Sequence, residues 1–246
     1  MRLAAAICFI IYAFSPAQAQ YIVNARAGLI TSAHGQLYLD KKPFHFTQNR
    51  YEELAKGQRL ETTSGLAEIQ LGPAASLWMG LQGSIGMLSP NITNTVVRLE
   101  RGEIFIEIAE KYKKNKISVQ LGNAVVELKE IGRYYINSTP PQLHVLEGKA
   151  GIQRNDRGKT VKKGKAVDLS DRMNIFAFRE DWSNQLLDWA NKRSNILFYP
   201  VRMARRMEAL RRQMDNLRYF RDMQEFQQMQ IQQMQMEQLR QRIPNP

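Results

Sequence analysis

Apolar and polar residues alternate along residues 57–79, which read GQRLETTSGLAEIQLGPAASLWM. Within residues 66–71 every second side chain is apolar, while Glu68 and Gln70 fall on the other face. A period of two predicts strands with one buried and one solvated face. Gly and Pro bracket this strand and favour chain reversal. The segment holds no nucleophile–base pair, metal-ligand spacing or phosphate loop, so it predicts architecture and no chemistry.

Short strands separated by turns are predicted along most of the chain. Further strands are expected at residues 28–32, 36–39, 84–88, 95–99, 103–108, 117–121, 124–128, 133–136, 143–146, 149–154 and 166–169. Their spacing of about eight to twelve residues, with no helical pattern between them, favours an antiparallel all-β domain. We expect Ala33-His34-Gly35 to close a hairpin between the first two strands. Residues 51–56 are expected to form a helical turn or a loop.

A short unit recurs in this region: an apolar strand end, a glycine, and then alternating apolar residues. It occurs around Gly102 and Gly148, and its second half follows Gly35 and Gly164. We expect each glycine at a hairpin turn or bulge that needs a positive φ. Such units bury a face only against their neighbours. The predicted fold class is therefore mainly β, an antiparallel two-layered or solenoid-like stack, followed by C-terminal α-helices.

Residues 57–79 resemble the FecR domain. That family's pattern begins with Gly-Asp/Gln-x-Leu-x-Thr, continues with a small-Glu-hydrophobic strand and ends with a Pro-small-Ser-hydrophobic strand. Here the three parts read Gly57-Gln58-Arg59-Leu60-Glu61-Thr62, Ala67-Glu68-Ile69 and Pro73-Ala74-Ala75-Ser76-Leu77. Later units at residues 99–106, 145–148 and 161–167 follow in that family's order, so the resemblance covers roughly residues 27–169.

The resemblance implies a periplasmic all-β binding or scaffolding module without catalytic residues. FecR regulators themselves carry a cytoplasmic helical segment and a transmembrane helix before the β domain. They relay signals from an outer-membrane transporter to a sigma factor. Here we expect the β domain to follow a leader directly, so the sigma-regulator function is not carried over.

The first residues have the pattern of a secretory leader. Arg2 precedes an apolar run at residues 3–14, and residues 17–19 have the small-x-small pattern of a cleavage site. The run is short for a membrane span, and a retained anchor is the alternative. Cys8, the one cysteine, lies in this leader, so the mature chain would have no disulfide or thiolate chemistry. We expect an exported protein, periplasmic or associated with the cell envelope.

The chain is strongly basic, with a net charge of +12, or 12 − 1 = +11 without Arg2. Basic exported proteins often lie near anionic lipid headgroups, lipopolysaccharide or cell-wall polymers. A solvated basic surface without a dedicated partner is the alternative. Lys111, Lys113 and Lys114 share one loop and are candidates for contact with an anionic envelope polymer or membrane surface, although solvated lysines are the simpler interpretation. Nucleic acid is not an expected partner.

Beyond residue 172 apolar residues recur at helical spacing. Trp182, Leu186 and Trp189 are expected to dock a first helix on the β domain, with an aromatic ligand platform as the alternative. The expected division is a leader at residues 1–19, a FecR-like all-β domain at 20–172, a docking segment and helix at 173–199, and a basic Met/Gln-rich helical tail at 200–246.

A second helix is expected from Val201 to about Arg242, with Pro200 in its first turn. A coiled-coil seam with spacings of four, three, four and three runs through Met203, Met207, Leu210, Met214 and Leu217. The heptad fails at Arg221, and the tail carries 9 − 5 = +4 from nine arginines and five acids. Three interpretations stay open: a self-associating helix, an adaptable helix for a partner groove or membrane surface, and a solvated, partly frayed tail.

Few residues suggest catalysis. The three histidines share no metal-binding spacing. Glu103/Glu107 and Glu127/Glu130 could supply paired carboxylates for glycoside chemistry, but alternation places Glu103 and Glu107 on a solvated sheet face. We therefore expect no enzyme activity, metal or cofactor.

The expected function is that of an envelope scaffold or protein-interaction module whose C-terminal helix mediates assembly. The alternative is a periplasmic binding or signalling module. It would recognise an anionic envelope glycan or the signalling domain of an outer-membrane transporter.

Overall fold

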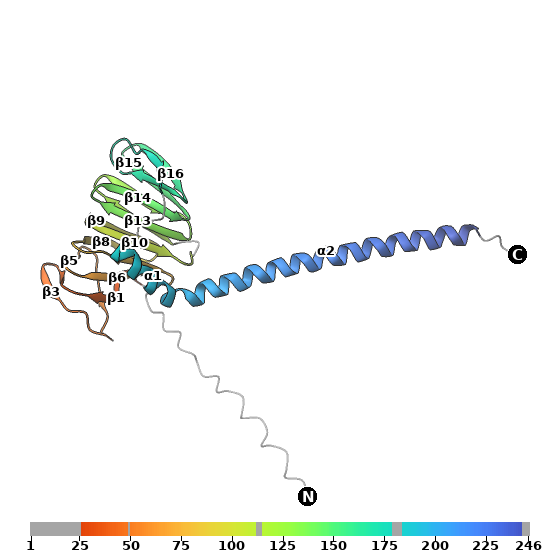
Figure 1. The fold of residues 1–246 in the computed structure, drawn as a ribbon, viewed down its shortest axis with the longest axis horizontal. Helices are drawn as coiled ribbons and strands as arrows, with labels where there is room; N and C mark the ends of the chain where they lie inside the picture. Colours follow the sequence, from red (N-terminus) through yellow and green to blue (C-terminus); the bar gives the residue numbers. More distant parts are fainter. Residues whose placement is uncertain (1–25, 49, 112–114, 179–183, 243–246) are drawn as a thin grey trace, which may run out of the picture.

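The computed structural model describes residues 26–48, 50–111, 115–178 and 184–242, with side-chain exposure described up to Met236. The expected leader, together with Lys113, Lys114 and Trp182, lies outside these ranges. Within them, strands form two nine-stranded sheets, and two helices follow (Figure 1). The mainly β fold with C-terminal helices is therefore confirmed.

The two sheets are built from alternating parts of the chain. Sheet A has the order β16 (Arg157–Lys162), β15 (Lys149–Arg154), β12 (Ala124–Leu128), β11 (Lys116–Leu121), β9 (Asn94–Arg101), β8 (Ser84–Asn91), β5 (Arg59–Thr62), β2 (Leu37–Leu39), β3 (Lys42–Phe44). Sheet B has the order β18 (Ile175–Ala177), β17 (Lys165–Asp168), β14 (Pro141–Glu147), β13 (Gly132–Ser138), β10 (Glu103–Ile108), β7 (Ala75–Met79), β6 (Leu66–Gly72), β1 (Leu29–His34), β4 (Glu52–Glu53). Sheet B thus continues past residue 172 through β18.

The connection at Ala33-His34-Gly35 is not a hairpin. β1 pairs with β4 and β6 in sheet B, whereas β2 pairs with β3 and β5 in sheet A. The chain crosses from one sheet to the other at Gly35. The hairpin prediction was wrong because two alternating strands around a turn can either pair with each other or face each other across a core.

Gly102 and Gly148 sit at crossings of the same kind, from β9 to β10 and from β14 to β15. Their φ angles are +83° and +86°, as the recurring unit predicted, but each lies at an arch between sheets and not at a hairpin turn. A Cβ on Gly148 would lie 2.5 Å from the carbonyl oxygen of Ile131 and 2.6 Å from the Tyr134 hydroxyl. Successive arches therefore pack so closely that a side chain has no room there.

Two further local predictions need correction: that all strands pair antiparallel, and that residues 51–56 form a helical turn or a loop. β9 and β11 run parallel, since the chain between them passes through β10 in the opposite sheet and returns in the same direction. Residues 51–56 form a loop that contains the short strand β4 and no helical turn, and Leu54 is fully buried. Edge pairing with β1 and burial of Leu54 outweigh the local helical preference.

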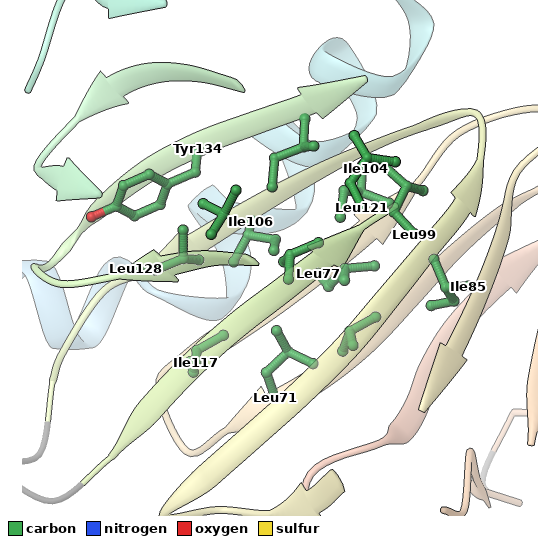
Figure 2. Packing of buried hydrophobic residues seen from close by; sticks show 14 of the residues in the cluster. Leu71, Leu77, Ile85, Leu99, Ile104, Ile106, Ile117, Leu121, Leu128 and Tyr134 are labelled. Atoms are coloured by element: carbon green, nitrogen blue, oxygen red, sulfur yellow. The ribbon is translucent and has the colours of Figure 1, made fainter. Parts of the chain in front are cut away.

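The main core fills the space between the sheets. Ile104 and Ile106 of β10 point into it from sheet B, and Leu99 of β9 and Leu121 of β11 from sheet A (Figure 2). These inward residues are those that the period-two pattern had marked as apolar. Burying each such side chain contributes about 1.5–3 kcal/mol, so the stack rests on its own packing.

The chain ends in two helices, α1 (Gln185–Leu197) and α2 (Tyr199–Arg242). Asn184 caps α1, since its Oδ1 accepts a hydrogen bond of 2.8 Å from the Leu187 amide. Pro200 lies in the first turn of α2, where its missing N–H has no intrahelical partner in any case. Neither helix in the described ranges is both long and apolar enough to cross a membrane.

Candidate interaction site

α1 covers the outer face of sheet B. Trp78, Phe105 and Tyr135 stand on the adjacent strands β7, β10 and β13 and form a second apolar cluster with the helix. The buried residues of α1 are Leu186, Leu187, Ala190 and Ser194. Trp189 is half-buried, and its ring meets that of His34 edge-on at 5.9 Å. The predicted docking of this helix through Leu186 and Trp189 is therefore confirmed.

The outer face of sheet B was predicted to be solvated, and this prediction was wrong. Glu68 is fully buried, Glu107 is nearly so, and Glu103 is half-buried beside them. The alternation was correctly placed, but a helix from far along the chain covers its polar side. We call Glu68, Glu103 and Glu107 the carboxylate clamp.

Glu68 of β6 holds the end of α1. Arg193 donates to it from Nε at 2.7 Å and from a terminal nitrogen at 3.0 Å. The Thr31 hydroxyl donates at 2.6 Å and the Trp78 indole N–H at 2.9 Å. Burial raises the pKa of Glu68, yet these hydrogen bonds outweigh it and leave the pKa below its ordinary value. Glu68 is therefore a buried carboxylate with all of its oxygens occupied.

Glu107 of β10 joins α1 to α2. The Ser194 hydroxyl donates to one of its oxygens at 2.6 Å, and Arg202 donates to the other at 2.8 Å. Arg202 also donates to the Ser194 carbonyl oxygen at 3.0 Å, and Arg205 donates to the carbonyl oxygen of Ala109 at 2.9 Å. The first turns of α2 are thus bound both to sheet B and to the last turn of α1.

Glu103 holds the start of α1. It accepts hydrogen bonds from the Tyr135 hydroxyl and, at 3.1 Å, from the side-chain amide of Asn184. Burial and the neighbouring Glu103 carboxylate raise the pKa of Tyr135. The clamp therefore grips the helices at three points, which fixes the direction in which α2 leaves the body.

Past its first turns α2 extends away from the sheets (Figure 1). Its 44 residues correspond to a rod of about 66 Å. The predicted seam residues are all exposed on it, from Met203 at 36% to Leu217 at 62%. The described exposed apolar residues of α2 are Tyr199, Met203, Met207, Leu210, Met214, Leu217, Tyr219, Phe220, Met223, Phe226, Met229, Ile231, Met234 and Met236.

Of the three candidate lysines in the predicted basic loop, Lys111 is described. Its ammonium group donates to the carbonyl oxygen of Leu128 at 3.3 Å and to that of Lys129. This lysine thus fastens its loop to the end of β12. Lys113 and Lys114 lie outside the described residues, so the grouping of the three candidates stays a prediction.

Sheet A carries a shallow polar groove of about 280 Å³ on its outer face. Its charged lining residues are Glu127, Lys129 and Lys159. Lys159 already donates to the carbonyl oxygen of Met173 at 2.8 Å. Within the described ranges no group of three or more His, Cys, Asp or Glu could hold a metal ion.

Sequence reasoning missed the carboxylate clamp. A usable signal was present: Phe105 shares its predicted face with Glu103 and Glu107. Trp78 stands on the neighbouring strand β7. Large aromatic residues on a face assigned to water indicate that something covers it. No comparable signal assigns Arg193 to Glu68, because 125 positions separate them.

Comparisons with known proteins give limited similarity. No family model matches the sequence, and no curated protein matches it significantly. Two crystal structures of a candidate anti-sigma factor from Parabacteroides distasonis ATCC 8503, at 2.50 and 1.65 Å resolution, are similar to this chain. Each has a TM-score of 0.41, with 13% and 12% identity, and each match covers 50% of this chain and 60% of the other. The match spans less than two thirds of that protein, and the FecR resemblance rests on the sequence motifs.

Proposed function

We propose that this chain is a non-catalytic, exported interaction module whose β body is a rigid support and whose helix α2 mediates assembly. The observation that carries the proposal is the contrast along α2. Arg202 and Arg205 bind its root to sheet B, while the helix beyond them exposes a long series of large apolar side chains.

An apolar series of this size favours a partner. Full burial of one such side chain contributes about 1.5–3 kcal/mol, and monomeric proteins rarely expose large contiguous apolar surfaces. A helix whose direction is fixed at its root also loses less orientational freedom on binding than a free tail would. Both effects support association through α2.

The envelope location rests on sequence. The leader-like pattern of residues 1–19 supports export, and the resemblance of residues 57–79 to the FecR domain supports a periplasmic module without catalytic residues. The excess of basic residues suits an anionic surrounding such as the envelope.

The test compares molar mass by light scattering for residues 20–246 and 20–206. The shorter chain keeps Arg202 and Arg205, so the clamp stays intact, which a cut at Tyr199 would not allow. We expect association in the longer chain alone, with equal thermal stability of the β body in both. Monomers of both chains over the whole concentration range would reject assembly of the chain through α2.

A second candidate function is recognition of an anionic envelope glycan or of a transporter signalling domain. The groove on sheet A favours it, because Lys129 lines it together with polar side chains such as Gln153 and Thr160. Such a binder would keep its affinity in residues 20–206, lose it on Lys129→Gln, and weaken with added salt. Binding of purified lipopolysaccharide that requires α2 would speak against this candidate.

A further inference from the structure

Two groups of exposed apolar residues on α2 lie on opposite faces of the helix, and this bears on how the proposed assembly is built. At about 100° per residue, the five seam residues from Met203 to Leu217 fall within about 40° of one line. We call them face 1. Tyr219, Met223, Phe226 and Met234 centre about 180° away, and we call them face 2. Residues of face 1 are 36–62% exposed, and those of face 2 are 42–63% exposed.

Charge divides along the helix at the same place. Residues 202–221, which carry face 1, hold seven arginines and two acids, or 7 − 2 = +5. Residues 222–239, which carry most of face 2, hold three acids and no basic residue, or −3. The exposed apolar residues change from face 1 to face 2 at residues 217–219. The net charge of the helix changes from positive to negative close to the same place, after residue 221.

The two patterns decide among the ways in which copies can pair. Face 1 on face 1 would bring two strongly basic halves together, which is unfavourable. Face 1 on face 2 joins opposite charges. Two straight helices lying side by side cannot make that contact twice, because the faces point in opposite directions. To make the contact twice, the two helices would have to wind around each other by half a turn within about 20 Å. The pitch of such a supercoil would be far below the value of about 150 Å that is usual for two-stranded coiled coils.

We propose that the occupant of each face is the opposite face of another copy of this chain. Face 1 of one α2 packs on face 2 of the next, and each helix contacts two neighbours. Such a head-to-tail contact is heterologous, so it builds a ring where the rotation closes and an open chain where it does not. This inference rests on the proposed assembly function and specifies its geometry.

Paired variants of residues 20–246 test it. Leu210→Gln/Leu217→Gln removes face 1, and Met223→Gln/Phe226→Gln removes face 2. Both variants keep the charge and use a good helix former. Met229→Gln/Ile231→Gln removes two exposed apolar residues from the flanks, about 80° on either side of face 1, and serves as the matched control. Helical circular dichroism checks that α2 persists in each.

Light scattering should give masses above a dimer for the wild type and the control, and monomers for either face variant alone. An equimolar mixture of the two face variants should form dimers and nothing larger, because one intact face 1 meets one intact face 2. Added salt should weaken this contact.

Three outcomes would overturn the inference. Dimers formed by either face variant alone would show self-pairing of a face, and the assembly function would then stand without this geometry. Association strengthened by salt would mean that like charges meet. A wild-type protein that stays monomeric would remove both the geometry and the assembly function. Its cosedimentation with anionic phospholipid vesicles would then assign α2 to a membrane surface.

Discussion

Replacing Glu68 by glutamine tests the carboxylate clamp with a change of one atom and one charge. Glu68 is 0% exposed and accepts four hydrogen bonds. A glutamine keeps one acceptor oxygen and turns the other into a donor. In either orientation its amide nitrogen faces an Arg193 N–H, so at least one bond is lost and Arg193 stays partly buried without its counter-charge.

The expected cost is about 3 kcal/mol, the lower end of the range for removing one partner of a buried ion pair. The lower end applies because the Arg193 side chain is 27% exposed, so water reaches it. Against a total stability of about 5–15 kcal/mol, this is a large fraction. It should appear in urea unfolding of residues 20–246 as a lower midpoint at an unchanged slope.

Glu100→Gln is the matched control. Glu100 accepts from Arg59 at 2.8 Å and from the Ser84 hydroxyl at 3.0 Å, on the outer face of sheet A. Because both side chains of that ion pair are partly exposed, its loss should cost less than about 1 kcal/mol. A double-mutant cycle of Glu68→Gln with Arg193→Gln should give a coupling above about 1.5 kcal/mol. Equal costs for the two glutamate variants, or a coupling near zero, would refute the clamp.

Three smaller predictions concern the body and the helix. The pKa of Glu68 is lower in the folded protein than its ordinary value of 4.5, so the unfolded chain takes up a proton at higher pH than the folded protein does. The contribution of Glu68 to the free energy of unfolding is therefore full above pH 4.5 and declines as the pH falls through the folded pKa. Unfolding from neutral pH downward should therefore show the wild type approaching Glu68→Gln in stability, and a constant gap would contradict this. Gly148→Ala should lower the free energy of unfolding by more than about 3 kcal/mol, because its Cβ would meet the backbone of Ile131. Gly57→Ala should lower it by about 1 kcal/mol, since Gly57 has a φ of +84° but nothing within 4 Å of an added Cβ. Similar melting temperatures of the two variants would argue against the tight arch. Residues 20–206 should keep the melting temperature of residues 20–246 at low protein concentration, since α2 beyond Arg206 is exposed.

The strands could be predicted because their signal is local. A period of two is visible within five or six residues, and the inward residues Ile104 and Ile106 followed it. The route between strands could not be predicted in the same way. A glycine with positive φ serves a hairpin and an arch equally well, so Gly35 and Gly102 fixed the position of a turn without showing which sheet the chain enters next.

The candidate site was predicted in part. The long second helix follows from the sequence, and the structure places it at Tyr199–Arg242. Met203 to Leu217 are exposed on it, and their role as a coiled-coil seam stays a prediction. The clamp depends on contacts across the fold, such as Arg202 with Glu107, whose residues lie 95 positions apart. Period-two patterns report which residues share a face, but they do not report what covers that face.

α1 buries apolar residues on sheet B, whereas α2 exposes most of its own. This difference gives the strongest argument for a role of α2 beyond stability. Most of the cover on the apolar outer face of sheet B comes from α1, through Leu186, Leu187 and Ala190, and from Phe198 directly after it. α2 adds Val201 at its root and the clamp contacts of Arg202 and Arg205. The body would therefore lose little if the helix ended there. The large apolar side chains that follow are exposed and contribute nothing to the core, and exposing them favours aggregation. This contrast supports the proposed contact of α2 with another molecule.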